Sequence, residues 1–197
     1  MEQIDRAKFS IDRQGLLEAL NESLNAHNAV SKLTVLALVD LKNFSQVNQR
    51  HGYANGDKIL AELQIRLAAI PKNPICCRRV DGDKFALIFS PLLNIQLIPL
   101  VAKKIIDQLS NLFVIDDQPI LLEGSIGFSA SSAGVNAEEI LQEAEAAAKQ
   151  AHSNQQQYHI SEASAVENAQ HQIALKQQVI QGLNENSFQL YYQPQIS

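Results

Sequence analysis

The sequence predicts an α/β fold in which a mixed β-sheet carries helices on both faces and a further linker helix follows it. Residues 33–41 form a nearly continuous apolar run, which is typical of a central strand buried on both faces. Residues 75–80 and 85–90 are rich in β-formers and flank an Asp-Gly pair, the strongest short-range signal for a hairpin. A hairpin in the middle of the chain means that the sheet is not all parallel.

The composition is that of a soluble globular protein. The chain has 197 residues, of which 46% are hydrophobic and 19% charged, and its net charge is −5. This acidic balance argues against a nucleic-acid partner, and no apolar run approaches the ~20 residues of a membrane span. The N-terminal segment contains no signal-peptide core. We therefore expect a cytoplasmic protein.

The only two cysteines, Cys76 and Cys77, are adjacent in the sequence. Adjacent side chains on a strand point to opposite faces, so we expect no disulfide between them. No set of Cys and His residues has the spacing of a zinc site. Both thiols are therefore expected to stay reduced.

In the first half of the chain, apolar periodicity predicts three helices around the central strand. They are expected at residues 11–30, at residues 44–51, and from near Asn55 to Ile70. The second of these helices stops at Gly52, and the third has Gly56 and Asp57 in its first turn. The strand 33–41 therefore leads directly into a pair of helices.

The second half of the chain continues the alternation of strands and helices. Helices are expected at residues 94–112 and 136–152, and strands at residues 113–115, 119–130 and 158–160. Pro99 marks a late start or a kink, while Asn136 caps its helix and places Glu138 and Glu139 in the first turn. The small residues at 124–129 predict close backbone packing. This order predicts a ferredoxin-like β-α-α-β-β-α-β core.

The hairpin turn carries three charges, at Asp81, Asp83 and Lys84. Turns collect Asp and Gly for backbone reasons, so an ordinary solvated turn is one interpretation. The other is a metal–phosphate site, because Asp40 ends the central strand and the neighbouring hairpin brings Asp83 to the same edge. Mg²⁺ prefers hard oxygen ligands and usually takes one or two carboxylates together with phosphate oxygens.

A spaced set of residues resembles the GGDEF domain of the diguanylate cyclase family. The set consists of Asp40, Leu41, Phe44, Asn48, Asp57, Asp81, Gly82, Asp83, Lys84 and Phe85, followed by residues 124–127 and 144–147. The resemblance extends from residue 34 to residue 160 and implies a nucleotidyl-cyclase-like form of the predicted fold. Family members join two GTP molecules into cyclic di-GMP, one from each half of a dimer, with Mg²⁺ on the triphosphate.

The resemblance also implies roles for individual residues. Asp40, Asp83 and the carbonyl group of Leu41 match the metal-binding positions. Asn48 and Asp57 match the pair that hydrogen-bonds guanine, and Phe44 belongs to the same nucleotide-binding set. Guanine presents both donors and acceptors, which suits an amide and a carboxylate. From spacing alone, a simpler interpretation is that Asn48 is a C-terminal residue of one helix and that Asp57 is an acidic residue in the first turn of the next.

Several positions depart from the family pattern. Asp81 stands at the first glycine of the signature, where a negative side chain would repel phosphate, and Lys84 reverses the charge of the signature Glu. Further departures are Lys42, Ser45 and His152, and the Arg-x-x-Asp inhibition motif is replaced at residues 72–75. Catalysis depends on several groups held in one geometry, so these losses predict a catalytically inactive domain. A slow but active cyclase and a protein-interaction scaffold without nucleotide remain alternatives.

The chain is predicted to continue beyond this domain. We expect an N-terminal helix within residues 1–31, a degenerate GGDEF domain at 32–160, a linker helix at 161–186, and the start of a truncated EAL domain at 187–197. Residues 188–196 form a strong β pattern that resembles the first strand of EAL domains, the cyclic di-GMP phosphodiesterase family. The linker helix is either a solvated spacer or a dimer helix. The expected partners are therefore the adjoining EAL domain, GTP and a second copy of the chain.

Overall fold

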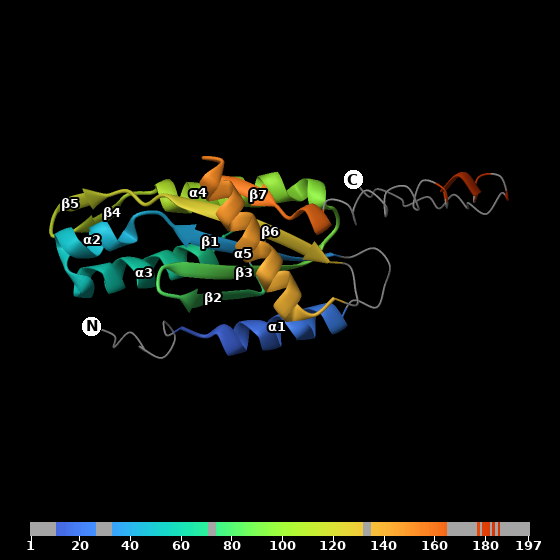
Figure 1. The fold of residues 1–197 in the computed structure, drawn as a ribbon, viewed down its shortest axis with the longest axis horizontal. Coiled ribbons are helices and arrows are strands. Elements are labelled where there is room, and N and C mark those ends of the chain that lie inside the picture. The colour runs from blue at the N-terminus through green and yellow to red at the C-terminus, as the bar shows by residue number, and fades with distance from the viewer. Residues whose placement is uncertain are drawn as a thin grey trace, which may run out of the picture.

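A computed structural model describes residues 11–26, 33–70, 74–131 and 135–164, together with residues 177, 179–181, 183 and 185. Its main sheet has the strand order β2-β3-β1-β6-β7 (Figure 1). The central strand β1 (Leu33–Leu41) pairs antiparallel with β3 (Lys84–Leu92) and with β6 (Gly124–Ser131). Strand β2 (Cys76–Asp81) completes the hairpin with β3, and β7 (Tyr158–Ile160) runs parallel to β6. The predicted mixed sheet is confirmed.

Helices cover both faces of this sheet, as predicted. Helices α1 (Arg13–Asn25) and α5 (Ala137–Ser153) pack on one face, and Figure 1 shows α5 crossing it with α1 beside β2. Helices α3 (Tyr53–Ala68) and α4 (Ile98–Ser110) pack on the other face. The short helix α2 (Phe44–His51) follows β1 and packs against α3.

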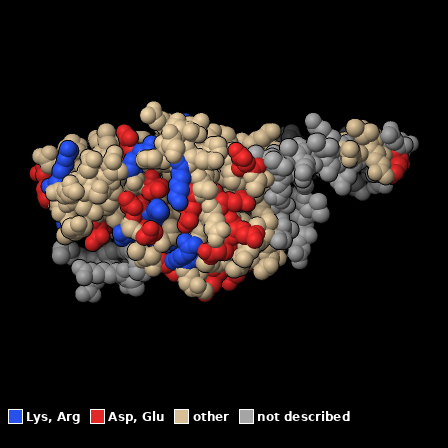
Figure 2. Space-filling model, in the orientation of Figure 1, with Lys and Arg blue, Asp and Glu red and all other residues tan. Residues whose placement is uncertain are grey.

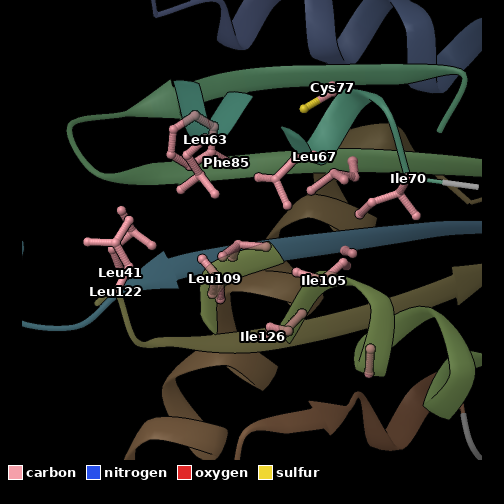
Figure 3. Close-up of a cluster of buried hydrophobic side chains, with 14 of the residues drawn as sticks. Leu41, Leu63, Leu67, Ile70, Cys77, Phe85, Ile105, Leu109, Leu122 and Ile126 are labelled. Atoms are coloured by element: carbon pink, nitrogen blue, oxygen red, sulfur yellow. The ribbon is translucent and has the colours of Figure 1, made fainter. Parts of the chain in front are cut away.

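The apolar run of β1 is explained by burial on both sides. Val35, Ala37 and Val39 belong to the core beneath α3 and α4, while Leu36 and Leu38 belong to the core beneath α1 and α5. Figure 3 shows the first core, where side chains of α3, β3, α4 and β6 meet. Full burial of one such side chain stabilises the fold by about 1.5–3 kcal/mol.

The two cysteines lie on opposite faces of β2. Cys77 belongs to the core beneath α3, and Cys76 belongs to the core beneath α1. Both are free thiols, as predicted. Burial raises the pKa of Cys77 to about 12 and also raises that of Cys76, so both thiols stay protonated and unreactive at neutral pH.

Two helix boundaries in the first half of the chain differ from the predictions. Helix α1 begins at Arg13 instead of Ile11, because Asp12 caps it by accepting a hydrogen bond from the Gly15 amide (2.8 Å), and it ends at Asn25 with Ala26 as its C-cap. Helix α3 begins at Tyr53 instead of near Asn55. Gly52 has a φ of 82°, and this left-handed conformation ends α2 and starts α3 without an intervening loop.

The region predicted as one strand at residues 119–130 is divided into two. Strand β5 (Gln118–Ile120) pairs with β4 (Phe113–Ile115) in a separate two-stranded sheet, and only β6 joins the main sheet. Asp116 and Asp117 both have positive φ values, 49° and 60°, which is the two-residue hairpin geometry. The local turn therefore pairs β5 with β4, and β6 begins as a separate strand at Gly124.

Helix α4 has the late start that Pro99 suggested. A 3₁₀ turn (Ile95–Leu97) comes first, with its amide at Gln96 bonded to the Asn94 side chain (2.9 Å). Pro99 then lies in the first turn of α4, where a missing N–H leaves no helical hydrogen bond unmade. The helix is therefore straightforward to form despite its proline.

Helix α5 begins as predicted and lies unusually close to the sheet. The side chain of Asn136 accepts a hydrogen bond from the Glu138 amide (3.0 Å), which confirms the cap. A Cβ atom on Gly127 would overlap the carbonyl oxygen of Ala144 and the amide nitrogen of Ala148. The close backbone packing predicted for residues 124–129 is thus confirmed, and glycine at 127 is what permits it.

The C-terminal predictions are covered only in part. Residues 162–164 form a helical turn, and the described positions 177, 179–181 and 183 are helical, which agrees with a helix in the predicted linker. Residues 187–197, predicted as the start of an EAL domain, lie outside the described residues. Among the described helices, none is long and apolar enough to cross a membrane.

The face formed by α5 and α1 carries charges of both signs. Figure 2 shows Lys and Arg side chains interspersed with Asp and Glu over these helices. Arg13 of α1 is paired there with Glu138 (2.6 Å) and Glu145 (3.2 Å) of α5. Among the described residues of this face, Lys and Arg form no continuous stripe of the kind that would bind a nucleic acid.

Candidate functional site

The end of β1 and the β2–β3 turn meet at one edge of the sheet. Asp40 is the register partner of Lys84 on β3 and of Ser125 on β6. The backbone amide of Leu41 donates a hydrogen bond to the carbonyl oxygen of Asp83 (3.3 Å). The fold therefore brings together Asp40, Leu41 and Asp83, the three residues predicted as metal-binding.

The turn satisfies its own polar groups. Asp81 and Lys84 are register partners, so Gly82 and Asp83 form the two-residue loop. The Gly82 amide donates to Oδ1 of Asp81 (2.9 Å), and the Gly82 carbonyl accepts from Nε of Arg79 (2.7 Å). The ammonium group of Lys84 lies 3.9 Å from Oδ2 of Asp81. The Gly82 amide is thus occupied by a carboxylate of the protein.

Asp40 is half-buried and surrounded by charged groups. Its pKa is raised above the usual 3.8, chiefly because burial removes water from the carboxylate. Lys84 and His152 act in the opposite direction, while Asp83 and Asp81 raise the pKa further. All four groups therefore lie close enough to influence Asp40, and one of them, His152, comes from α5.

The raised pKa of Asp40 predicts a pH-dependent gain in stability for Asp40→Asn. A raised carboxyl pKa contributes stability that is present below the unfolded value of 3.8 and is lost as the pH rises through the folded value. The variant should therefore have a larger free energy of unfolding than the wild type at about pH 7, with the difference disappearing below pH 3.8. Urea unfolding across this range measures it.

The matched control for that experiment is Asp107→Asn, which removes an exposed carboxylate that pairs with Lys103 on α4. An equal gain in both variants would show that the loss of overall negative charge, and not the burial of Asp40, is responsible. A loss of stability in Asp40→Asn at neutral pH would contradict the prediction.

The predicted guanine-binding residues lie where α2 meets α3. The Asn48 side chain of α2 faces Gly56 of α3, where any Cβ atom would overlap its Oδ1. Asp57, the next residue of α3, is exposed, and its Oδ1 lies 4.0 Å from Nη1 of Arg79. Arg79 also holds the turn through Gly82, so it joins the predicted guanine-binding region to the turn.

Phe44 occupies a different environment from the other predicted site residues. Its side chain is only 3% exposed and belongs to the core beneath α3 and α4. The ring also lies under Gly56, with Cζ 3.5 Å from the position of a Cβ atom there. Phe44 therefore supports the α2–α3 junction from within the core. Phe85 is likewise fully buried.

Two residues of this site are not singled out by the sequence patterns. Arg79 is predicted only as one residue of the strand 75–80, although its place shortly before the turn is a usable signal. Ser125 is 1% exposed, and its hydroxyl has no hydrogen-bond partner in the part of the chain that the structure describes. Its position opposite Asp40 depends on the pairing of β1 with β6, which no local pattern predicts.

The residues at this edge could hold Mg²⁺ only with help from a ligand. Within the described residues, no group of three or more His, Cys, Asp or Glu side chains could hold a metal ion. Asp40 and Asp83 supply two carboxylates, and Mg²⁺ commonly completes such a set with phosphate oxygens. The oxygen donors therefore fit a magnesium–nucleotide complex, although the ammonium group of Lys84 already acts on Asp40.

Comparison with known families agrees with this geometry. Residues 11–158 match the family model described as diguanylate cyclase, GGDEF domain. The chain belongs to the GGDEF family. The match includes α1, the strands β1, β2, β3 and β6 of the main sheet, and the whole edge at which Asp40 meets the β2–β3 turn.

Curated relatives of this GGDEF chain are much longer proteins. Signaling protein YkoW of Bacillus subtilis is 25% identical over 193 residues, which cover 94% of this chain and 24% of the relative. The bifunctional diguanylate cyclase/cyclic di-GMP phosphodiesterase MucR of Pseudomonas aeruginosa is 28% identical over 160 residues, which cover 80% of this chain and 23% of the relative. The chain thus spans about a quarter of the length of these relatives.

Solved structures share the same fold. Diguanylate cyclase SiaD of Pseudomonas aeruginosa, in complex with its activator SiaC, gives a TM-score of 0.67 at 25% identity over 74% of this chain and 56% of SiaD. The GGDEF domain of TpbB from the same organism gives 0.70 at 21% identity over 76% of this chain and 89% of that chain. The predicted cyclase-like fold is confirmed by these neighbours.

Proposed function

We propose that this chain is a GGDEF domain that has lost cyclase activity and acts as a regulatory module in cyclic di-GMP signalling. The observation that carries the proposal is the self-satisfied turn, in which Asp81 occupies the Gly82 amide and Lys84 is paired with Asp81. The chain has Asp-Gly-Asp-Lys-Phe at residues 81–85, where the family signature is Gly-Gly-Asp-Glu-Phe.

Electrostatics gives the physical reason for the loss of activity. A triphosphate approaching the turn would meet the negative charge of Asp81 and would have to displace its carboxylate from the Gly82 amide. At position 84 the chain has the ammonium group of lysine, where the family signature has the carboxylate of glutamate. Because transition-state stabilisation requires charges that are already correctly placed, both substitutions act against it.

Weak GTP binding is the second part of the proposal. Asn48 and Asp57 retain the amide and carboxylate that suit guanine, and Gly56 leaves room for the Asn48 side chain. Asp40 and Asp83 would hold Mg²⁺ together with the phosphates, and the ion would neutralise phosphate charge there. The bound nucleotide would then act as a regulatory ligand instead of a substrate.

We also propose that the regulated partner is an EAL domain that follows in the same cytoplasmic chain, with a second copy of the GGDEF domain as a further partner. Residues 188–196 resemble the first strand of EAL domains. MucR, a relative, is named for both activities, and the alignment with YkoW covers more of this chain than the GGDEF match does. These relatives support a two-domain parent protein.

The proposal is tested by incubating the chain with GTP and Mg²⁺ and measuring cyclic di-GMP by liquid chromatography. We expect no product above a no-enzyme control under conditions in which an active diguanylate cyclase converts its substrate completely. Clear product formation would overturn the proposal in favour of a slow cyclase. A thermal-shift measurement with GTP separates a nucleotide-binding module from a scaffold, because a ligand that binds the native state raises Tm.

A further inference from the structure

The chain leaves the sheet through a compact turn after β7. The Ser161 amide donates to the carbonyl oxygen of Phe128 on β6 (2.8 Å), which extends the β7 pairing by one bond. Residues 162–164 then form a helical turn, and the Ser164 amide donates to Oγ of Ser161 (3.2 Å). Ser161 therefore adds one hydrogen bond to the sheet beyond β7 and also caps the helical turn at residues 162–164.

Ser164 covers backbone groups of β6 that β7 is too short to reach. The Ala130 amide donates to Oγ of Ser164 (2.8 Å), and the Ala130 carbonyl lies 3.1 Å from the same hydroxyl. Oγ of Ser161 is 2.7 Å away, so the Ser164 hydroxyl donates to one of these two oxygens at a time. One side chain from the helical turn thus replaces the next residue of a paired strand.

Glu143 of α5 joins this turn to the helix layer. Its Oε2 accepts hydrogen bonds from Ser129 of β6 (2.7 Å) and from Ser161 (3.0 Å). The three serines Ser129, Ser161 and Ser164 are 0%, 7% and 2% exposed, so water competes little for these bonds. Hydrogen bonds to a carboxylate are stronger than neutral ones, and losing a partner leaves a buried polar group unsatisfied.

We propose that Glu143, Ser161 and Ser164 form a joint that fixes the direction in which the chain leaves the domain. The joint connects α5, β6 and the helical turn at residues 162–164 through side chains, so it sets the position of that turn relative to the sheet. The identity of the domain that follows the joint depends on the proposed function, whereas the joint itself does not. Glu143, Ser161 and Ser164 act here as positioning residues.

The first test measures amide hydrogen exchange at Ala130 by NMR in the whole chain. Ser164→Ala should raise the exchange rate of the Ala130 amide by about ten- to a hundredfold, since its acceptor is removed. The Ile126 amide, which donates to the Gln157 carbonyl (3.0 Å), should keep its protection and so report that the variant is folded. Ser153→Ala, at an exposed position of α5, is the matched control. Unchanged exchange at Ala130 would overturn the role of Ser164.

The second test measures the distance between spin labels at Glu22→Cys on α1 and Ala163→Cys in the helical turn, both exposed positions. The native thiols of Cys76 and Cys77 are buried with raised pKa values, so they should not react with the label. We expect a narrow distance distribution that broadens in Ser164→Ala and broadens less in Glu143→Gln, which keeps an acceptor without its charge. A broad distribution in the unaltered joint, or no change in either variant, would refute the proposal. Neither test involves nucleotide or catalytic activity. Detection of cyclase activity would therefore refute the proposed function without affecting the proposal for the joint.

Discussion

Replacing Gly127 with alanine is expected to destabilise the domain by about 3 kcal/mol, or to prevent folding altogether. The added methyl group would overlap the backbone of α5 at Ala144 and Ala148, and backbone atoms cannot swing away as a flexible side chain can. Relief requires α5 to move off β6, which would open the core that also contains Leu36 and Leu38 of the central strand. Urea unfolding followed by circular dichroism measures the loss.

Gly82→Ala is the matched control for this prediction. Gly82 has nothing within 4 Å of the position of an added Cβ atom, and it does not adopt a positive φ. The same chemical change should therefore alter the free energy of unfolding by about 0.5 kcal/mol or less. Equal losses in the two variants would mean that intrinsic glycine effects, and not the contact with α5, dominate at Gly127.

The double variant Asp81→Gly/Lys84→Glu is expected to bind GTP at least about tenfold more tightly in the presence of Mg²⁺. Removing the Asp81 carboxylate frees the Gly82 amide and takes away a negative charge where the proposed function places the phosphates of GTP. The second substitution, Lys84→Glu, restores an acid in place of the ammonium group that acts on Asp40. Calorimetry with GTP and Mg²⁺ measures the affinity, and chromatography measures any cyclic di-GMP formed.

The single variants separate the two causes in this experiment. Asp81→Gly alone should give most of the gain in affinity, because it removes the carboxylate from the turn, whereas Lys84→Glu alone adds a negative charge while Asp81 remains. Lys103→Glu reverses a charge on the exposed surface of α4 and should leave GTP binding unchanged. If the double variant binds GTP no better than the wild type, Asp81 and Lys84 are not what limits binding.

Features with a local physical cause were predictable from the sequence. Strand β1 and helix α2 have the predicted bounds, because a strand buried on both faces and a helix that stops at glycine both leave strong local patterns. The Asn136 cap and the late start at Pro99 also follow from the chemistry of single residues. The meeting of Asp40 with the turn was predictable once the hairpin was expected beside the central strand.

Features that depend on distant pairings were not predictable. Where β6 begins depends on its pairing with the distant strand β1, and the apolar pattern of residues 119–130 does not mark that start. Ser164 and Ala130 are 34 residues apart, so their contact leaves no local signal in the sequence.

The open surroundings of Gly82 have a consequence for how such a domain changes over generations. The turn at residues 81–84 is largely solvent-facing, so substitutions there alter chemistry at little cost to folding. Gly127 and the joint at Ser164 lie in the interior, where substitutions are penalised through stability. Substitutions in this turn can therefore change or remove catalytic activity without unfolding the domain. Substitutions in the interior are limited by the stability of the fold, whether or not the domain is active.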